Sequence, residues 1–290
     1  MMITDGELAI AAAQAGAAVV LGKYGSALTR FDKSAGDFAT SADVEAERAV
    51  IDVLRAARPG DAVTGEESGR VDPAPLAAAG RTGEGGRVDP APLAAAGRTG
   101  DGERMWLVDP LCGTRNFAAR TMLVAVNVAL RTGSEITAAA SADPFSGEVF
   151  WTDGTAARVR RDGADEPLTP SAESRLVDVN LDPPFPNAPR FRAVDLLADP
   201  RFGQRFGPRV VSSTLAVAWV AAGRRAAYVT DGRLRDSVHF AAGIAVCRAA
   251  GCVITDIEGQ PVHTGVGGLV VAADHETHAT LLELMGGFRG

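Results

Sequence analysis

Acidic residues gather in three short segments that each border a turn. They are GDFATSAD at residues 36–43, TGEESG at residues 64–69 and WLVDPLCGTRNF at residues 106–117. Carboxylates brought together from separate loops repel one another unless cations neutralise them, and carboxylate oxygens are ligands that suit Mg²⁺. A metal ion held in this way can screen the charge of a phosphomonoester and activate a water molecule. The three segments therefore predict a metal site.

Together with a later segment, DSVHFAAG at residues 236–243, these segments form an ordered series. This series resembles the inositol monophosphatase superfamily, which includes inositol phosphatases, fructose bisphosphatases and 3′-phosphoadenosine nucleotidases. Intervening stretches such as MLVAVNVAL at residues 122–130 and AAGIAVCRAAGCVITD resemble the framework of the same family. The resemblance runs from about Lys33 to the C-terminal helix. It implies a layered α-β-α-β sandwich of the sugar-phosphatase type, in the α/β class.

The resemblance also implies a first metal site. Glu66 matches the first glutamate of the family's Gly-Glu-Glu motif, which is a metal ligand. Asp109 matches the first aspartate of Asp-Pro-x-Asp-Gly-Thr, which bridges two metal ions. Leu111 would bind the metal through its backbone carbonyl. Magnesium is the cofactor that this set of oxygen ligands implies.

Water activation and phosphate binding are assigned by the same resemblance. Thr114 matches the threonine that orients the attacking water, with Asp43 as its acidic partner. Gly113 and Thr114 would contact the phosphate, because a helix that starts there offers free N–H groups and the positive end of its dipole. Ser212 matches the serine of a Gly-Ser pair that precedes a late helix, although Val211 replaces the glycine. We expect Ser212 to contact the substrate.

Two positions depart from the family pattern. Cys112 stands where the motif has its second aspartate, and His239 stands where the late motif has its aspartate. Both aspartates are ligands of the second metal in the resemblance. A free thiol has a pKa of about 8.5 and is mostly protonated near neutral pH, and a histidine there is mostly neutral. Four carboxylates thus become two, and we expect the second magnesium site to be weakened.

Three readings of this broken site stay open. Cys112 can be a small buried residue that fills the space of an aspartate. Cys112, His239 and Asp109 can instead form a softer site, which suits zinc by ligand type. His239 can also act as a general acid or base, and Asp236, three residues earlier, can supply a displaced carboxylate. The catalytic candidates are Asp43, Thr114, Cys112 and His239.

Three functions also stay open. The first is a metal-dependent phosphomonoesterase that acts on a small sugar or nucleotide phosphate with a degenerate second metal site. The second is a repurposed enzyme of specialised metabolism, of the lyase or cyclase type, that uses Cys112 and His239. The third is a non-catalytic pseudophosphatase, which acts as a binding or regulatory protein. Fold alone does not choose among them, because function lies in the site.

Composition excludes several other classes. The net charge of −7 over 290 residues argues against a nucleic-acid surface, which needs a basic face. The apolar stretches are too short to cross a bilayer, and no basic region precedes the Ala-rich N-terminal run, as a secretory signal would require. Three cysteines are too few for a disulfide framework. We expect a cytoplasmic protein without a membrane partner.

Hydrophobic patterns predict the elements that hold these residues. Helices are predicted at residues 5–21, 43–57, 215–223, 240–250 and 275–285. Strands are predicted at residues 105–108, 123–130, 148–151, 226–230, 253–256 and 269–271. We expect an N-terminal α+β half at residues 1–150, which carries the metal motifs, and a C-terminal α/β half at residues 151–290. The family resemblance also implies a homodimer.

A tandem duplication interrupts the first half. The fifteen residues GRVDPAPLAAAGRTG at positions 69–83 recur unchanged at positions 86–100. Two Pro- and Gly-rich copies without an apolar period do not make a solenoid, which needs three or more stacked units. Added length costs little free energy in an exposed loop. We therefore predict that residues 69–100 form a surface excursion.

Overall fold

The computed structural model describes residues 3–34, 37–73, 103–182, 193–232, 234, 237–263 and 267–286. Residues 74–102, which include most of the duplicated segment, lie outside the described part of the chain, so the placement of that segment stays a prediction. Asp236 also lies outside the described residues, and the same holds for its suggested role as a ligand.

The first sheet has eight strands in the order β10-β9-β8-β7-β6-β5-β3-β4. Their bounds are β3 (Ala62–Gly65), β4 (Gly69–Val71), β5 (Arg104–Cys112), β6 (Ala125–Thr132), β7 (Glu135–Ala142), β8 (Val149–Thr152), β9 (Ala157–Arg161) and β10 (Ala164–Pro167). Strands β3 and β5 run parallel, with Gly65 opposite Val108, while the other described neighbours in this sheet are antiparallel. The carboxyl ends of β3 and β5 therefore meet at one edge of the sheet.

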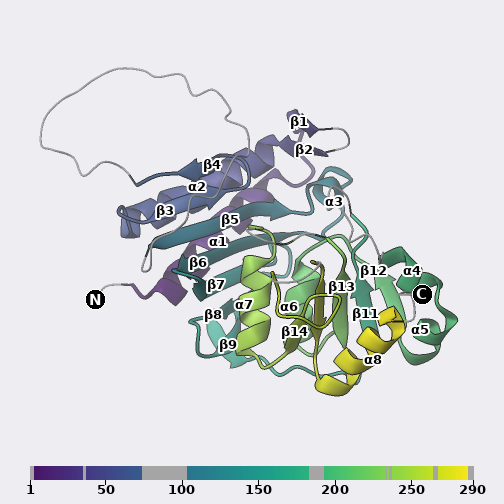
Figure 1. The fold of residues 1–290 in the computed structure, drawn as a ribbon. Helices are drawn as coiled ribbons and strands as arrows, with labels where there is room; N and C mark the ends of the chain where they lie inside the picture. Colours follow the sequence, from purple (N-terminus) through teal and green to yellow (C-terminus); the bar gives the residue numbers. More distant parts are fainter. Residues whose placement is uncertain are drawn as a thin grey trace, which may run out of the picture.

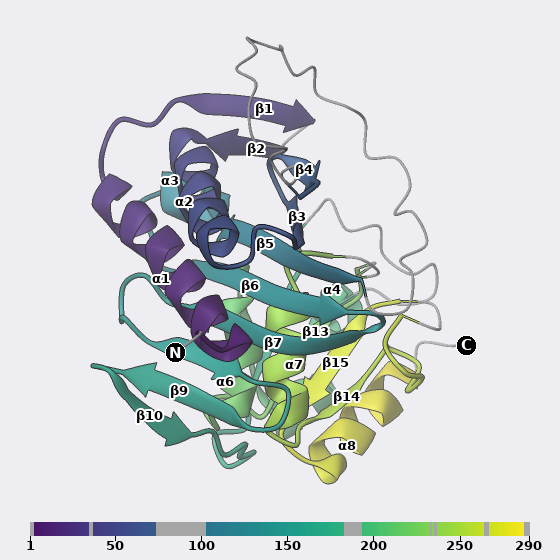
Figure 2. The ribbon, with the colours of Figure 1, turned by 90° about the vertical axis from the view of Figure 1, so that its left-hand side faces the viewer.

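Helices cover both faces of this sheet. Helices α1 (Asp5–Lys23) and α2 (Ser41–Ala57) pack on one face, and α6 (Leu215–Ala221) and α7 (Ala241–Ala249) lie on the other (Figures 1 and 2). Alternate residues of β6 point to opposite faces of the sheet. Val126 and Val128 pack in the core beneath α1 and α2, whereas Ala129 packs beside α7. This alternation follows from the two-residue period of a strand. Small alanines at this contact let α7 approach the sheet.

The second sheet has five strands in the order β12-β11-β13-β15-β14. They are β11 (Leu176–Val179), β12 (Gly207–Val210), β13 (Ala227–Thr230), β14 (Val253–Thr255) and β15 (Leu269–Ala272). Helices α4 (Ala193–Ala198), α5 (Pro200–Arg205) and α8 (His275–Gly286) cover its outer face; in Figure 1, α4 and α5 are green and α8 is yellow. The remaining elements are the hairpin β1 (Arg30–Ser34) and β2 (Asp37–Thr40), and the short helix α3 (Thr114–Ala118).

The layered α-β-α-β architecture expected from the sequence is confirmed, and α4, α5 and α8 add an outer helical layer. The first sheet continues through β10 to Pro167, past the residue-150 division that the sequence suggested. None of the helices in the described residues combines the length and the hydropathy needed to cross a membrane.

Candidate active site

Glu66 follows β3 and is placed by a buried carboxylate on α2. Glu47 accepts hydrogen bonds from the backbone N–H groups of Glu67 and Ser68, each at 2.8 Å. These bonds hold the turn between β3 and β4 against helix α2. A Cβ atom on Gly65 would lie 2.4 Å from Glu47 Oε2, so a larger residue there would displace the carboxylate that holds the turn. Glu66 is thereby directed toward the end of β5.

Asp109 lies on β5 and is fully buried. Its Oδ2 accepts a hydrogen bond of 3.2 Å from Asn127 Nδ2 on the opposite strand and lies 2.9 Å from His239 Nδ1. Its Oδ1 has no donor among the described residues, apart from the Glu66 carboxyl when that group is protonated. Glu66 Oε2 lies 3.9 Å from the same His239 nitrogen. Glu66 and Asp109 are thus brought together, as the sequence suggested.

The proximity of these groups shifts their proton affinities. Burial and the neighbouring charge of Asp109 raise the pKa of Glu66 to about 8. Burial on its own would lower the pKa of His239, but the charge of Asp109 and its hydrogen bond outweigh burial and raise that pKa to about 9. Without a bound metal ion, the carboxyl groups of Glu66 and Asp109 are therefore neutralised near neutral pH either by a proton or by a cationic side chain of the protein.

Lys33 on β1 supplies one such cation. Its Nζ lies 3.0 Å from Glu66 Oε1 and 2.6 Å from Glu67 Oε1. Burial would lower the pKa of Lys33, but the two glutamates raise it above its ordinary value. Lys33 thus stays charged, and its ammonium group partly neutralises the acidic turn.

Asp43 links the start of α2 to the start of α3. Thr40 is the N-cap of α2, and Asp43 Oδ2 accepts hydrogen bonds from its N–H at 2.7 Å and from its hydroxyl at 2.6 Å. The other oxygen, Oδ1, accepts a hydrogen bond of 2.7 Å from Thr114 Oγ1. The capping box explains why α2 begins at Ser41, two residues earlier than the sequence pattern suggested. Asp43 is therefore held rigidly with one oxygen on Thr114.

Helix α3 begins directly after Gly113, a position where no other residue fits. Gly113 has φ of 104°, and a Cβ atom there would lie 2.8 Å from the Leu123 carbonyl oxygen. This conformation turns the chain at the end of β5, so that the Leu111 carbonyl lies 3.2 Å from Thr114 Oγ1. Ser212 joins the same region, because its carbonyl accepts a hydrogen bond of 2.8 Å from Asn116 Nδ2.

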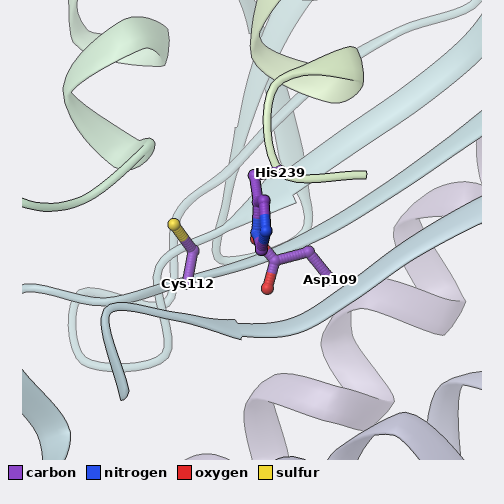
Figure 3. Close-up of side chains that lie close together, drawn as sticks. All are labelled: Asp109, Cys112 and His239. Atoms are coloured by element: carbon purple, nitrogen blue, oxygen red, sulfur yellow. The ribbon is translucent and has the colours of Figure 1, made fainter. Parts of the chain in front are cut away.

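Cys112 and His239 both reach this site. Cys112 ends β5, and its Sγ accepts a weak hydrogen bond of 3.4 Å from the N–H of Thr214, which precedes α6. His239 lies in the turn before α7. Figure 3 shows Asp109, Cys112 and His239 close together, where the end of β5 meets the turn before α7. The two substituted positions therefore face the same carboxylate.

The predicted residues border one cavity of about 160 Å³. Its lining includes Glu66, Leu111, Cys112, Thr114, Ser212 and His239. Gly113 also lines it, whereas Asp109 and Asp43 lie beneath, buried behind the lining residues. Such a cavity, with carboxylates, a hydroxyl and a thiol converging on it, can hold a small polar ligand and a cation.

A layered α/β protein with carboxylates gathered at the end of its first sheet has the form of the sugar-phosphatase fold. Residues 5–286 match the model of the inositol monophosphatase family, and the chain belongs to this family. It is 30% identical over 260 residues to an inositol-1-monophosphatase of Caulobacter vibrioides, a match that covers 87% of this chain and 88% of the relative.

Two further proteins that are similar to this chain carry other names. The Nus factor SuhB of Escherichia coli is 27% identical over 261 residues, covering 87% of this chain and 84% of that protein. The crystal structure of the extragenic suppressor protein suhB from Bartonella henselae superimposes with a TM-score of 0.74 at 24% identity, covering 96% of each chain. The second likeness establishes the fold.

Three residues of the site were not predicted from the sequence. Lys33 contacts Glu66 and Asn127 contacts Asp109, both of which were predicted, whereas Glu47 binds the backbone of the turn that follows Glu66. The sequence signal that could have indicated Lys33 was its position ahead of a turn and close to Asp43. The local sequence around Glu47 predicts only a helix, and that around Asn127 predicts only a strand. Their contacts with the site become visible only in the folded structure.

The raised pKa of His239 predicts a pH-dependent stability of the metal-free protein. A pKa that rises from 6.5 to about 9 on folding stabilises the protein fully below pH 6.5, and this contribution is lost as pH rises through 9. The loss is at most about 3 kcal/mol. In the presence of a chelator, the melting temperature should fall by several degrees between pH 6.5 and 9.

Thermal melts of His239→Asn over the same pH range provide the comparison. We expect this variant to melt lower at pH 6.5 and to approach the natural chain at pH 9. Glu66 makes a second contribution, because its pKa rises from 4.5 to about 8 on folding and its stabilisation is likewise lost as pH rises. Melts of Glu66→Gln separate this contribution from that of His239. Parallel melting curves for the natural chain and His239→Asn would refute the prediction.

Proposed function

We propose that this chain is a metal-dependent phosphomonoesterase that acts on a small sugar or nucleotide phosphate. The observation that carries the proposal is the hydrogen bond of 2.7 Å between Thr114 Oγ1 and Asp43 Oδ1, beside a cavity that Glu66 also lines. A hydroxyl bonded to a buried carboxylate next to acidic ligands is an arrangement that can orient a nucleophilic water. Membership of the inositol monophosphatase family supports the same reaction class.

The first metal position fits a magnesium ion. Glu66, Asp109 and the Leu111 carbonyl would hold it, and all three offer oxygen, which Mg²⁺ prefers. The buried Asp109 Oδ1 lacks a donor other than a protonated Glu66, so it needs a cation or a proton. When bound, the ion would screen the phosphate charge and lower the pKa of a water molecule. The second position does not fit magnesium, because Cys112 and His239 offer sulfur and nitrogen there.

Thr114 and Asp43 would hold the attacking water. The single hydroxyl proton of Thr114 is donated to Asp43 Oδ1, which leaves oxygen lone pairs of Thr114 to accept a proton from water. As the water attacks, its proton can pass to Thr114 Oγ1 while the hydroxyl proton passes to Asp43. Burial raises the pKa of Asp43, although its hydrogen bonds with Thr40 and Thr114 work against this, and a raised pKa makes Asp43 a better proton acceptor.

Substrate binding falls to the rest of the lining. Gly113, Thr114 and Ser212 would contact the phosphate, and Arg115 lies beside them at the cavity. The cavity admits a small phosphorylated molecule. The proposal retains the homodimer and the cytoplasmic location that the sequence and the resemblance suggested.

One observation favours a different candidate. Lys33 lies between Glu66 and Glu67, and His239 is bonded to Asp109, so that side chains of the protein provide cations where the family resemblance implies metal ions. A site neutralised in this way suits a non-catalytic protein that binds a small molecule, or an enzyme of another class that uses Cys112 and His239. A relative that carries the name of a Nus factor is consistent with a role other than catalysis.

Phosphate release by the purified chain separates these candidates. We expect inorganic phosphate to be released from a panel of sugar and nucleotide monophosphates in the presence of Mg²⁺, and the release to stop when a chelator is added. Asp109→Asn removes the carboxylate shared by both metal positions and should abolish release under the same conditions. Release that is absent across the panel with magnesium, manganese and zinc would overturn the phosphatase proposal.

A further inference from the structure

We propose that Asp109, Cys112 and His239 form a site for one zinc ion, in place of the second magnesium ion that the family resemblance implies. The proposal concerns metal binding itself and does not require the chain to be a phosphatase. It shares only Asp109 with the first metal position. The described residues contain this one group of three histidine, cysteine or acidic side chains that could hold a metal ion.

The distances between the donor atoms are close to those of a zinc site. One ligand atom from each residue lies within 4.8 Å of the other two. Zinc bonds of about 2.0–2.3 Å at tetrahedral angles place ligand atoms roughly 3.3–3.7 Å apart. His239 Nδ1 and Asp109 Oδ2, at 2.9 Å, need to separate by only a few tenths of an ångström. Cys112 Sγ, which lies within 4.8 Å of the other two ligand atoms, needs to approach by at most about 1 Å, which a side-chain rotation at the end of β5 can provide.

The chemical types of the ligands select zinc over magnesium. Asp109 offers oxygen, His239 nitrogen and Cys112 sulfur, and this mixed set of donors is typical of Zn²⁺. Magnesium requires close to six oxygen ligands in octahedral geometry and gives up its water reluctantly. Two of the three side chains here would provide none. Calcium is excluded for the same reason.

Surrounding residues orient the ligands. Asn127 Nδ2 donates to Asp109 Oδ2 at 3.2 Å and to Thr214 Oγ1 at 2.8 Å. Thr214 in turn donates its backbone N–H to Cys112 Sγ at 3.4 Å. Asp109 and Cys112 are therefore connected through one buried network. Such outer contacts fix the orientation of metal ligands and are a regular feature of protein zinc sites.

The site also leaves room for a fourth ligand. Cys112 and His239 both line the cavity of about 160 Å³, together with Thr114 and Ser212. Three protein ligands with an open fourth position are typical of catalytic zinc sites, whereas structural sites are closed by four protein ligands. The open position here would face the cavity, where water or an oxygen atom of a phosphate can complete the coordination.

Metal binding by the full chain tests this proposal. The protein is stripped with a chelator and then titrated with zinc alone, magnesium alone and cobalt alone. We expect one equivalent of zinc to bind and to raise the melting temperature at a concentration where magnesium does not. Cobalt should produce the absorption band of a thiolate–cobalt bond, which reports Cys112 directly. Cys112→Ser and His239→Asn should each weaken zinc binding by about 100-fold or more.

Cys252→Ser is the matched control. Cys252 is half-buried, packs on the second core and lies outside the cluster. This variant should retain the full zinc affinity and the cobalt band. A natural chain that binds no stoichiometric zinc, or a cobalt spectrum that lacks the thiolate band, would overturn the proposal, and unchanged zinc affinity in Cys112→Ser would do so as well.

The two proposals fail separately. Magnesium-dependent phosphate release by a chain that binds no zinc leaves the phosphatase and removes the zinc site. One equivalent of bound zinc without phosphate release leaves the zinc site and removes the phosphatase.

Discussion

A Thr114→Val protein should fold and yet release phosphate about 10²- to 10⁴-fold more slowly than the natural chain. Valine has nearly the shape of threonine but lacks the hydroxyl that bonds to Asp43 Oδ1 at 2.7 Å. The water would lose the group that accepts its proton. The buried Asp43 oxygen would also lose its donor, which costs about 1–3 kcal/mol, so the variant should melt a few degrees lower. Steady-state phosphate release and thermal melting measure both effects.

Thr114→Ser provides the matched control, because serine keeps the hydroxyl and should retain activity within about tenfold of the natural chain. Asp43→Asn tests the partner. Its amide can still face Thr40, but an NH₂ group directed at Thr114 reverses the hydrogen bond and removes the proton acceptor. Undiminished release by Thr114→Val, at normal substrate affinity, would show that the hydroxyl has no part in the reaction.

Much of the framework could be predicted from the sequence because its elements carry strong local signals. Residues 123–130 and 240–250 have apolar patterns that predict a buried strand and a buried helix, and these correspond to β6 and α7. Gly223 and Gly251, both with positive φ, follow the helices that the sequence placed before them. The region from residue 166 to residue 208 could not be assigned. Its described part contains β11, α4, α5 and the start of β12, which are short and gain their stability from packing.

The site was predictable to the extent that its residues lie in local motifs. Glu66 and Asp109 lie beside turns, and the parallel pairing of β3 with β5 brings these turns together. Local patterns do not reveal that pairing, because β3 and β5 are separated by about 40 residues that include the duplicated segment. Lys33 and Glu47 escaped prediction for the same reason, since each is defined by a contact across the fold.

We expect the substitutions at Cys112 and His239 to determine which ion the second metal position accepts. In the metal-free protein, the charge of His239 stabilises Asp109, and Cys112 adds no charge of its own near neutral pH, since burial and Asp109 raise its pKa well above the ordinary value. At the second metal position, charges that are already neutralised by the protein give little driving force for magnesium to enter. Restoring carboxylates at both positions should reverse this balance.

Cys112→Asp combined with His239→Asp should therefore create a magnesium site at the second position. The change leaves four carboxylates around one cavity, where like charges destabilise the metal-free protein and favour a divalent cation. We expect magnesium to raise the melting temperature of the double variant far more than that of the natural chain. A concentration 100 times the dissociation constant stabilises by about 2.7 kcal/mol. Magnesium-dependent phosphate release should also rise by about 100-fold or more above the natural chain.

The two single variants should each do little, because magnesium needs nearly complete oxygen coordination before its dehydration is compensated. A gain in the double variant far beyond the combined effects of the singles is the mark of residues that act as one unit. The same double change should abolish zinc binding and the thiolate–cobalt band, since it removes the sulfur and nitrogen donors together. If the natural chain uses Cys112 and His239 for its own chemistry, its native activity should disappear as magnesium dependence rises. A double variant that neither binds magnesium nor loses zinc would contradict the assignment of both residues to the metal site, and would favour a binding protein without catalysis.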